Sequence, residues 1–171
     1  MLIGRSSASY LAARGAATEL RVAALVCDPG QPDLSARVQA ALPRAVIELI
    51  RVGDPRADEL LAPILSSAAG RRLWLPRMAA HGASTLHDYL RDLLSYTVAD
   101  RIGSIQCPTL VTEASDDPAG GQSRAFFDRL TCPKELRAFS SAEGMAGHIG
   151  GMGQQVWNGF VFDWLARTLS A

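Results

Sequence analysis

The run Val22-Ala-Ala-Leu-Val-Cys27 is the longest uninterrupted apolar segment of the chain, and it ends at the turn signal Asp28-Pro29-Gly30. A short apolar run without alternation is typical of a strand that is covered on both faces, as in a parallel sheet. Cys107-Pro-Thr-Leu-Val-Thr112 is a second run of this kind, and Glu135-Leu-Arg-Ala-Phe139 is a third, weaker one. We therefore predict a three-stranded, mainly parallel sheet built from these three segments.

Segments with helical periodicity lie between and beside the predicted strands. Residues 7–20, 120–130 and about 152–169 each place apolar side chains near one helical face. Leu2-Ile3 is expected to add only a stub of strand before the first of these helices. Helices that alternate with apolar strands imply right-handed crossovers, so we predict an α/β fold with a short parallel sheet flanked by helices.

About eighty residues of a different character separate the first two strands. No apolar strand run occurs there, and the segment is predicted to be helical over residues 33–42, 55–68 and 84–96, with breaks at Pro43, Pro55, Pro63 and Pro76. We interpret this segment as a helical cap inserted into the sheet. The predicted organisation is an elbow, helix and first full strand over residues 1–30, a cap over 31–100, and a C-terminal α/β part over 101–171.

The composition excludes several classes of function. The 171 residues carry 17 basic and 17 acidic side chains, so the net charge is zero and nothing favours binding to nucleic acid or an anionic membrane. The longest apolar run is far too short to span a bilayer, and no secretory signal is visible, which favours a cytoplasmic protein. Cys27, Cys107 and Cys132 are widely spaced and are predicted to be reduced core thiols. We expect neither a metal nor a cofactor.

A candidate nucleophile lies at the N-terminus, in Gly4-Arg5-Ser6-Ser7-Ala8. The pentapeptide approximates the Gly-x-Ser-x-Gly elbow, in which a sharp strand-to-helix turn exposes a serine above the sheet. The helix that follows would favour developing negative charge at its N-terminus. Ala8 replaces the last glycine, which is expected to strain the turn. Taken alone, the match is weak, because Ser6 or Ser7 could simply cap the helix.

Two further residues complete a possible catalytic set. Asp117 follows the second predicted strand, and His148 lies in a glycine-rich loop after the third. The order Ser6, Asp117, His148 is the order of a serine–acid–histidine triad on an α/β sheet. In such a triad the histidine accepts the serine proton and the acid orients the imidazole. Asp116 is the alternative acid.

Several longer stretches of the chain resemble the α/β-hydrolase superfamily. The segment from Cys107 to Asp117 resembles its seventh strand and acid loop. The match continues through Gly120-Gly-Gln122, Phe127-Asp-Arg-Leu130, Ala142-Glu-Gly144, Gly147-His148 and Gly151-Met-Gly-Gln154. Together these segments look like the dienelactone-hydrolase-like esterases, near the fermentation–respiration-switch-like and pseudooxynicotine-type hydrolases.

The resemblance implies a function and a role for each residue. Ser6 would be the nucleophile, Asp117 the acid and His148 the base, with the amide of Ser7 as an oxyanion donor. The substrate would be a small ester-like molecule that is cleaved through an acyl-enzyme. Cleavage of a C–C or amide bond is the second choice. The alternative function is a non-catalytic hydrolase remnant or an interaction module. Such a module would use an exposed sheet edge to bind a second copy or another chain.

The resemblance also predicts that part of the fold is missing. In the superfamily the elbow follows the fifth strand, whereas Met1 lies three residues before Gly4. We therefore expect on the order of 100 residues of the fold, including the loop with the second oxyanion donor, to be encoded upstream of the Met1 codon. The apolar run at residues 22–27 supports this expectation, because a strand that is apolar on both faces suits the interior of a sheet.

Overall fold

The computed structural model describes residues 1–151 and 153–170 of the chain. They form two compact units. One unit combines Met1–Asp33 with the chain from Thr97 onward, and the other is Leu34–Tyr96. Asp33 and Thr97, where the chain leaves and re-enters the first unit, form an antiparallel β-bridge. The first unit is therefore assembled from two segments that are far apart in the sequence.

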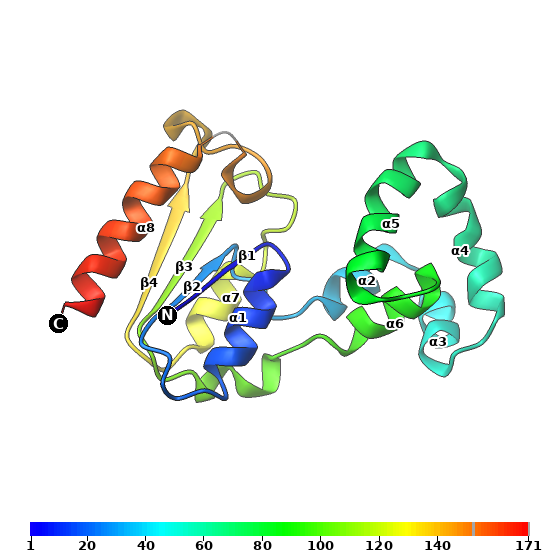
Figure 1. The fold of residues 1–171 in the computed structure, drawn as a ribbon, viewed down its shortest axis with the longest axis horizontal. Helices are drawn as coiled ribbons and strands as arrows, with labels where there is room; N and C mark the ends of the chain where they lie inside the picture. The colour runs from blue at the N-terminus through cyan, green and yellow to red at the C-terminus, as the bar shows by residue number, and fades with distance from the viewer. Residues whose placement is uncertain (152, 171) are drawn as a thin grey trace. The chain divides into compact units, whose positions relative to one another are not determined.

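A four-stranded sheet forms the centre of the first unit (Figure 1). Its strands are β1 (Leu2–Arg5), β2 (Leu25–Asp28), β3 (Thr109–Ala114) and β4 (Lys134–Phe139). They are arranged in the order β1-β2-β3-β4, and every neighbouring pair is parallel. All four carboxyl ends consequently meet at one edge of the sheet, which is where a parallel α/β sheet usually carries its site.

The prediction of a three-stranded sheet is wrong by one strand. Residues 2–5 are not a stub but a full edge strand, which pairs with β2 from Leu2↔Leu25 to Arg5↔Asp28. Its backbone ladder holds it in place, so it does not need the apolar run that marks a buried strand. The first predicted strand, at residues 22–27, also shifts, because β2 begins at Leu25 and continues to Asp28. Asp28 can belong to the strand because Arg5, its register partner, pairs with its carboxylate.

Helices cover both faces of the sheet. On one face, α1 (Ala8–Ala16) and α7 (Ser123–Arg129) pack against β2 and β3: the thiol of Cys27 contacts the carbonyl of Ser9, and Gly30 lies against Val111 and Phe126. On the other face, α8 (Gln154–Leu169) completes a core cluster. That cluster contains Ala24, Val26, Leu110, Phe139, Met145, Trp157, Val161, Trp164 and Leu165.

The expected helices of this unit are present with altered ends. The first covers Ala8–Ala16 rather than residues 7–20, and the helix expected over 120–130 is confined to Ser123–Arg129. The final helix begins at Gln154, while the expected start at residue 152 lies outside the described residues. Three short 3-10 segments lie in the connections, at Ala99–Ser104, Ser141–Glu143 and His148–Gly150. The last of these contains the candidate base.

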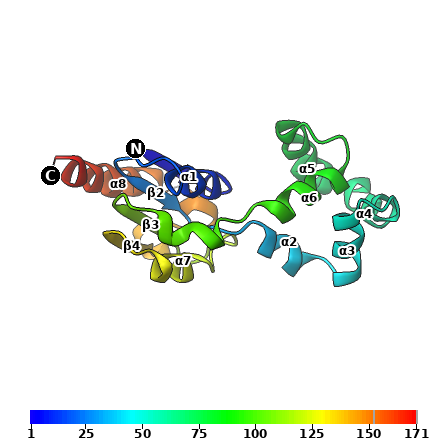
Figure 2. The same ribbon diagram turned by 90° about the horizontal axis from the view of Figure 1, so that it is seen from below.

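The second unit consists of helices around a core of its own, and their course can be followed in Figure 2. They are α2 (Ser35–Ala41), α3 (Arg44–Val52), α4 (Arg56–Ser66), α5 (Ala68–His81) and α6 (Leu86–Ser95). The predicted helix breaks at Pro43 and Pro55 are confirmed, since these residues directly precede α3 and α4, but Pro63 and Pro76 lie inside α4 and α5. The prediction of helix breaks at these two prolines is wrong, because packing of the apolar helix faces outweighs the lost backbone bond.

Candidate active site

The turn that carries the candidate nucleophile, residues 4–9, connects β1 to α1 and is named the nucleophile turn. A Cβ on Gly4 would lie 2.4 Å from the carbonyl oxygen of Ala8, so only glycine allows the strand to pass so close to the helix start. Ser6 has a φ of 56°, the left-handed conformation that a non-glycine residue seldom adopts. Ala8 is simply the first residue of α1. The backbone strain that was expected at Ala8 is therefore found at Ser6.

Backbone and hydroxyl bonds hold this turn against the neighbouring strand. The amide of Ser6 donates to the carbonyl of Asp28 at 2.7 Å. The hydroxyl of Ser9 donates to the carbonyl of Gly4 at 2.9 Å and accepts from the amide of Asp28 at 3.1 Å. The strained conformation of Ser6 is consequently fixed by contacts within β1, β2 and α1, as an elbow that presents a side chain above the sheet requires.

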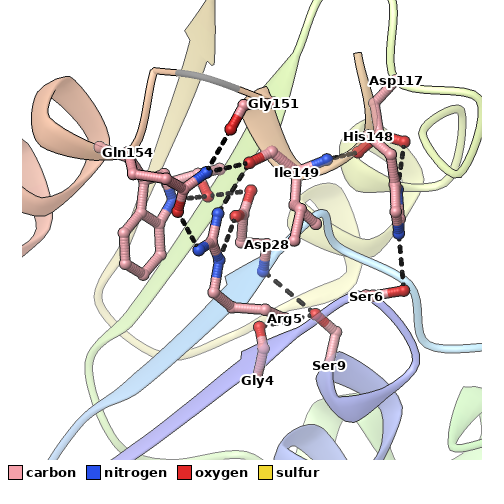
Figure 3. A network of polar contacts seen from close by, with 12 residues as sticks. Gly4, Arg5, Ser6, Ser9, Asp28, Asp117, His148, Ile149, Gly151 and Gln154 are labelled. Carbon is pink, nitrogen blue, oxygen red and sulfur yellow. Dashed lines mark hydrogen bonds and ion pairs between the residues drawn. The ribbon is translucent and has the colours of Figure 1, made fainter. Parts of the chain in front are cut away.

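The structure brings the three predicted triad residues together at the carboxyl edge of the sheet (Figure 3). Nε2 of His148 lies 2.8 Å from Oγ of Ser6, and Nδ1 lies 2.8 Å from Oδ1 of Asp117. An ionised carboxylate can only accept, so Nδ1 carries the proton and Nε2 is left to accept from the serine hydroxyl. The three side chains thus form one continuous relay from a hydroxyl to a buried acid.

Asp117 is held as an ionised carboxylate. Burial would raise its pKa, but hydrogen bonds from His148, from the amide of Ile149 at 2.7 Å and from the amide of Ala119 at 2.7 Å outweigh that effect and lower the pKa overall. The side chain of Asp117 is 0% exposed, whereas that of His148 is 42% exposed. The acid is therefore shielded from solvent while the imidazole remains accessible.

The two neighbouring aspartates have different contacts. Asp117 binds the imidazole of His148, whereas Oδ1 of Asp116 accepts the backbone amide of Gly147 at 2.7 Å. The resemblance favoured Asp117, but the position of the two acids does not separate them, because both follow β3 within a few residues. The geometry favours Asp117 as the acid of the relay and gives Asp116 a contact with the loop that carries His148.

Comparisons with known proteins bear on the fold. No protein-family model matches the chain, and no curated protein matches it at a significant level. Solved structures do match. The alpha/beta hydrolase GrgF from Penicillium sp. sh18 aligns with a TM-score of 0.62 and 18% identity, over 99% of this chain and 64% of GrgF.

Two further solved structures support the same fold assignment. A thermophilic esterase from Thermogutta terrifontis gives a TM-score of 0.55 and 18% identity, over 98% of this chain and 64% of the esterase. A proline iminopeptidase from Mycobacterium smegmatis gives 0.60 and 15% identity, over 97% of this chain and 64% of the peptidase. This chain has an α/β-hydrolase fold. It spans less than two thirds of the length of each of these structures.

Ser7, the predicted oxyanion donor, lies at the start of α1. It is the N-cap of α1, directly after Ser6, so its amide belongs to the group of N–H donors that precede the first intrahelical bonds. The partial positive charge at a helix start favours an oxyanion beside it. The backbone of Ser7, rather than its hydroxyl, is the group that can serve here.

A polar network under the relay was not anticipated from the sequence. Arg5 donates to Oδ2 of Asp28 at 2.9 Å, and Oδ1 of Asp28 accepts from the hydroxyl of Thr112 at 2.9 Å. The same hydroxyl accepts from Nε1 of Trp157 at 3.0 Å. A possible signal was the arginine inside the elbow pentapeptide combined with an aspartate at the end of an apolar run. Residues on α8, β1, β2 and β3 are thereby connected.

Other reactive groups differ in character from the relay. Cys27 and Cys107 are buried, Cys132 is partly buried, and all three are free thiols. Burial, reinforced by Cys107 and Asp28, raises the pKa of the Cys27 thiol well above its ordinary value, so it stays protonated.

Among the described residues, no group of three or more histidine, cysteine or acidic side chains could hold a metal ion. In that part of the chain no helix is both long and apolar enough to cross a membrane.

Proposed function

We propose that this chain carries the catalytic triad of a serine hydrolase that cleaves a carboxylic ester through an acyl-enzyme. The observation that carries the proposal is the relay from Ser6 through His148 to Asp117, with 2.8 Å at each step. An esterase from Thermogutta terrifontis and an enol-lactonase from Burkholderia xenovorans LB400 share the fold, which supports an ester as the substrate class. The resemblance to dienelactone-hydrolase-like esterases belongs to the same proposal.

The acylation step uses all three side chains. Nε2 of His148 accepts the hydroxyl proton while Oγ of Ser6 attacks the ester carbonyl carbon, which gives a tetrahedral oxyanion. Asp117 stabilises the imidazolium without taking its proton. The imidazolium then gives that proton to the leaving alkoxide, the C–O bond breaks, and an alcohol departs from the acyl-serine.

Deacylation repeats the cycle with water. His148 accepts a proton from water as the hydroxide attacks the acyl carbonyl, and it returns the proton to Oγ of Ser6 when the acid leaves. In both steps the amide of Ser7 is the proposed donor to the oxyanion, at the positive end of α1. Ser6 is thus regenerated, and the net reaction is ester plus water to acid plus alcohol.

A fluorophosphonate probe tests this proposal directly. The activated Ser6 oxygen should displace fluoride and form a stable phosphonate ester, which peptide mass spectrometry can assign to Ser6 or Ser7. Ser6→Ala should abolish labelling and reduce p-nitrophenyl ester hydrolysis by roughly 10⁴-fold or more. Ser7→Ala is the matched control, since it retains the Ser7 amide and should keep most of the activity.

The opposite outcome has a defined meaning. If the folded chain is neither labelled at Ser6 nor able to hydrolyse short-chain p-nitrophenyl esters above the rate of Ser6→Ala, the hydrolase proposal fails. The alternative, a non-catalytic remnant or interaction module of the same fold, would then be preferred. Labelling that moves to another serine would reject Ser6 as the nucleophile while leaving the fold assignment intact.

A further inference from the structure

We infer that Arg5 is a positioning residue that ties the loop carrying His148 to the turn carrying Ser6. The inference rests on the proposed function for its catalytic consequence. Arg5 immediately precedes Ser6, and its guanidinium reaches Ile149, the residue immediately after His148. One side chain therefore connects the backbone next to the nucleophile with the backbone next to the base (Figure 3).

The guanidinium of Arg5 uses its three nitrogens on three different partners. Nε donates to Oδ2 of Asp28 at 2.9 Å, Nη2 donates to the carbonyl of Ile149 at 2.7 Å, and Nη1 donates to Oε1 of Gln154. Gln154 in turn donates to the carbonyls of Ile149 at 3.1 Å and Gly151 at 3.0 Å. The planar fork of arginine suits such divergent acceptors, whereas the ammonium of lysine carries all its donors on one nitrogen and cannot span them.

Contacts with Asp28 and Trp157 hold the side chain of Arg5 in place. Its partner Asp28 is 1% exposed and is fixed on its other oxygen by Thr112. The guanidinium lies over the ring of Trp157, 4.3 Å from its centroid, and Trp157 donates to Thr112. Because the ring, the carboxylate and the hydroxyl belong to separate packed elements, the position of Arg5 is determined by the core of the unit.

The histidine loop, residues 147–151, needs such an external anchor. Gly147, Gly150 and Gly151 have positive φ, and so does Ile149, at 49°. An L-residue with a side chain is strained in this conformation, which persists only when its surroundings impose it. The amide of Ile149 donates to Asp117, and its carbonyl accepts from Arg5. These two bonds hold the amide and the carbonyl of Ile149 and thereby set the orientation of His148, the residue before it.

A purely structural ion pair with Asp28 is the competing explanation for Arg5. Arg5→Lys separates the two, because lysine can keep a positive charge beside the buried Asp28 but cannot also reach Ile149 and Gln154. We expect a thermal midpoint close to that of the parent chain. We also expect a fall of about 10- to 100-fold in kcat with little change in KM, and an equal slowing of fluorophosphonate labelling.

A matched control and a second variant complete the test. Arg21→Lys alters an exposed arginine that pairs with Glu19, and it should change neither rate nor stability. The double variant Arg5→Met with Asp28→Asn removes both charges of the ion pair together, which avoids leaving the buried carboxylate unpaired. If it folds, its kcat should fall at least as far as that of Arg5→Lys. A kcat equal to that of the parent chain in either folded variant would overturn the inference.

A readout that does not need turnover distinguishes this inference from the proposed function. Hydrogen exchange of the amides in residues 147–151 should be faster in Arg5→Lys, with unchanged protection in α8. If the parent chain shows no labelling of Ser6 but the loop exchanges faster in the variant, the hydrolase proposal fails and the anchoring role stands. Unchanged exchange in this loop overturns the anchoring role whatever the activity.

Discussion

The nucleophile turn and the histidine loop each present a side chain of the relay from a segment with strained backbone, but the two segments are held in different ways. Ser6 itself has positive φ, and its turn is fixed by backbone contacts with β2 and by the close approach at Gly4. In the histidine loop the strained residue is Ile149, and side chains from distant positions hold it. A local motif can specify the first arrangement, whereas the second requires the finished fold.

Of the variants that test this comparison, the largest loss of activity is expected for Asp117, whose carboxylate contacts both His148 and Ile149 of the histidine loop. Asp117→Asn replaces the carboxylate that orients His148, and the amide can present the wrong group to Nδ1. Activity on p-nitrophenyl esters should fall by roughly 10⁴-fold, in line with the loss of a triad acid. Steady-state kinetics and fluorophosphonate labelling would measure it. A loss of less than tenfold would contradict the assignment of Asp117.

The nucleophile turn can be broken by one methyl group. Gly4→Ala places a Cβ within 2.4 Å of the carbonyl oxygen of Ala8, so β1 and α1 must separate and Ser6 must move. We expect a loss of roughly 1–3 kcal/mol in the free energy of unfolding and about 100-fold in activity.

Gly159→Ala is the control for that change. Gly159 lies in α8, and a Cβ there would have nothing within 4 Å. The substitution should raise the free energy of unfolding by about 0.5–1 kcal/mol, since alanine favours a helix, and leave activity unchanged. Urea denaturation of Gly4→Ala and Gly159→Ala would measure both changes in the free energy of unfolding. Equal values for the two variants would show that the nucleophile turn is not tightly packed.

A smaller effect is expected where the histidine loop has another anchor. Asp116→Ala removes the acceptor for the amide of Gly147, at the entrance to the loop. Because Asp117 and Arg5 still hold Ile149, activity should fall by roughly tenfold rather than vanish. Kinetics of this variant beside Asp117→Asn would measure the difference, and equal losses would indicate that the two acids act as a unit.

The smallest effect concerns pH. The lowered pKa of Asp117 means that its folded-state contribution to stability is present above the unfolded value of about 3.9 and is lost as the pH falls through the lower folded value. The difference in thermal midpoint between the parent chain and Asp117→Asn should therefore close only below about pH 4. A difference that already closes near pH 6 would contradict an ionised acid.

The sequence predicted much of the fold because its signals are local. Apolar runs located three strands, helical periodicity located most helices, and the resemblance named the fold that solved structures share. The edge strand β1 was underestimated, because its stability comes from pairing with β2 rather than from its own composition. Pro63 and Pro76 misled the helix prediction, since the core of the second unit compensates for them.

The candidate site was also predicted only in part from the sequence. Ser6, Asp117 and His148 could be named from the sequence, because each occurs where a chain segment leaves a strand and the order along the chain is distinctive. The resemblance already favoured Asp117 over Asp116, and the tertiary structure shows that the carboxylate of Asp117 contacts the imidazole while that of Asp116 contacts the amide of Gly147. The proposed role of Arg5 also depends on the tertiary structure, because its partners lie 23 or more positions away along the chain.

Backbone preferences and apolar patterning act over a few neighbouring residues, so the sequence alone indicated three of the four strands, the elbow and the residue types of the relay. The tertiary structure alone decided how the histidine loop is held. Its strained backbone gains its stability from Asp116, Asp117, Arg5 and Gln154, which converge on the loop only when the sheet and α8 have assembled. Hydrogen bonds between residues up to 149 positions apart leave no periodic trace in a sequence.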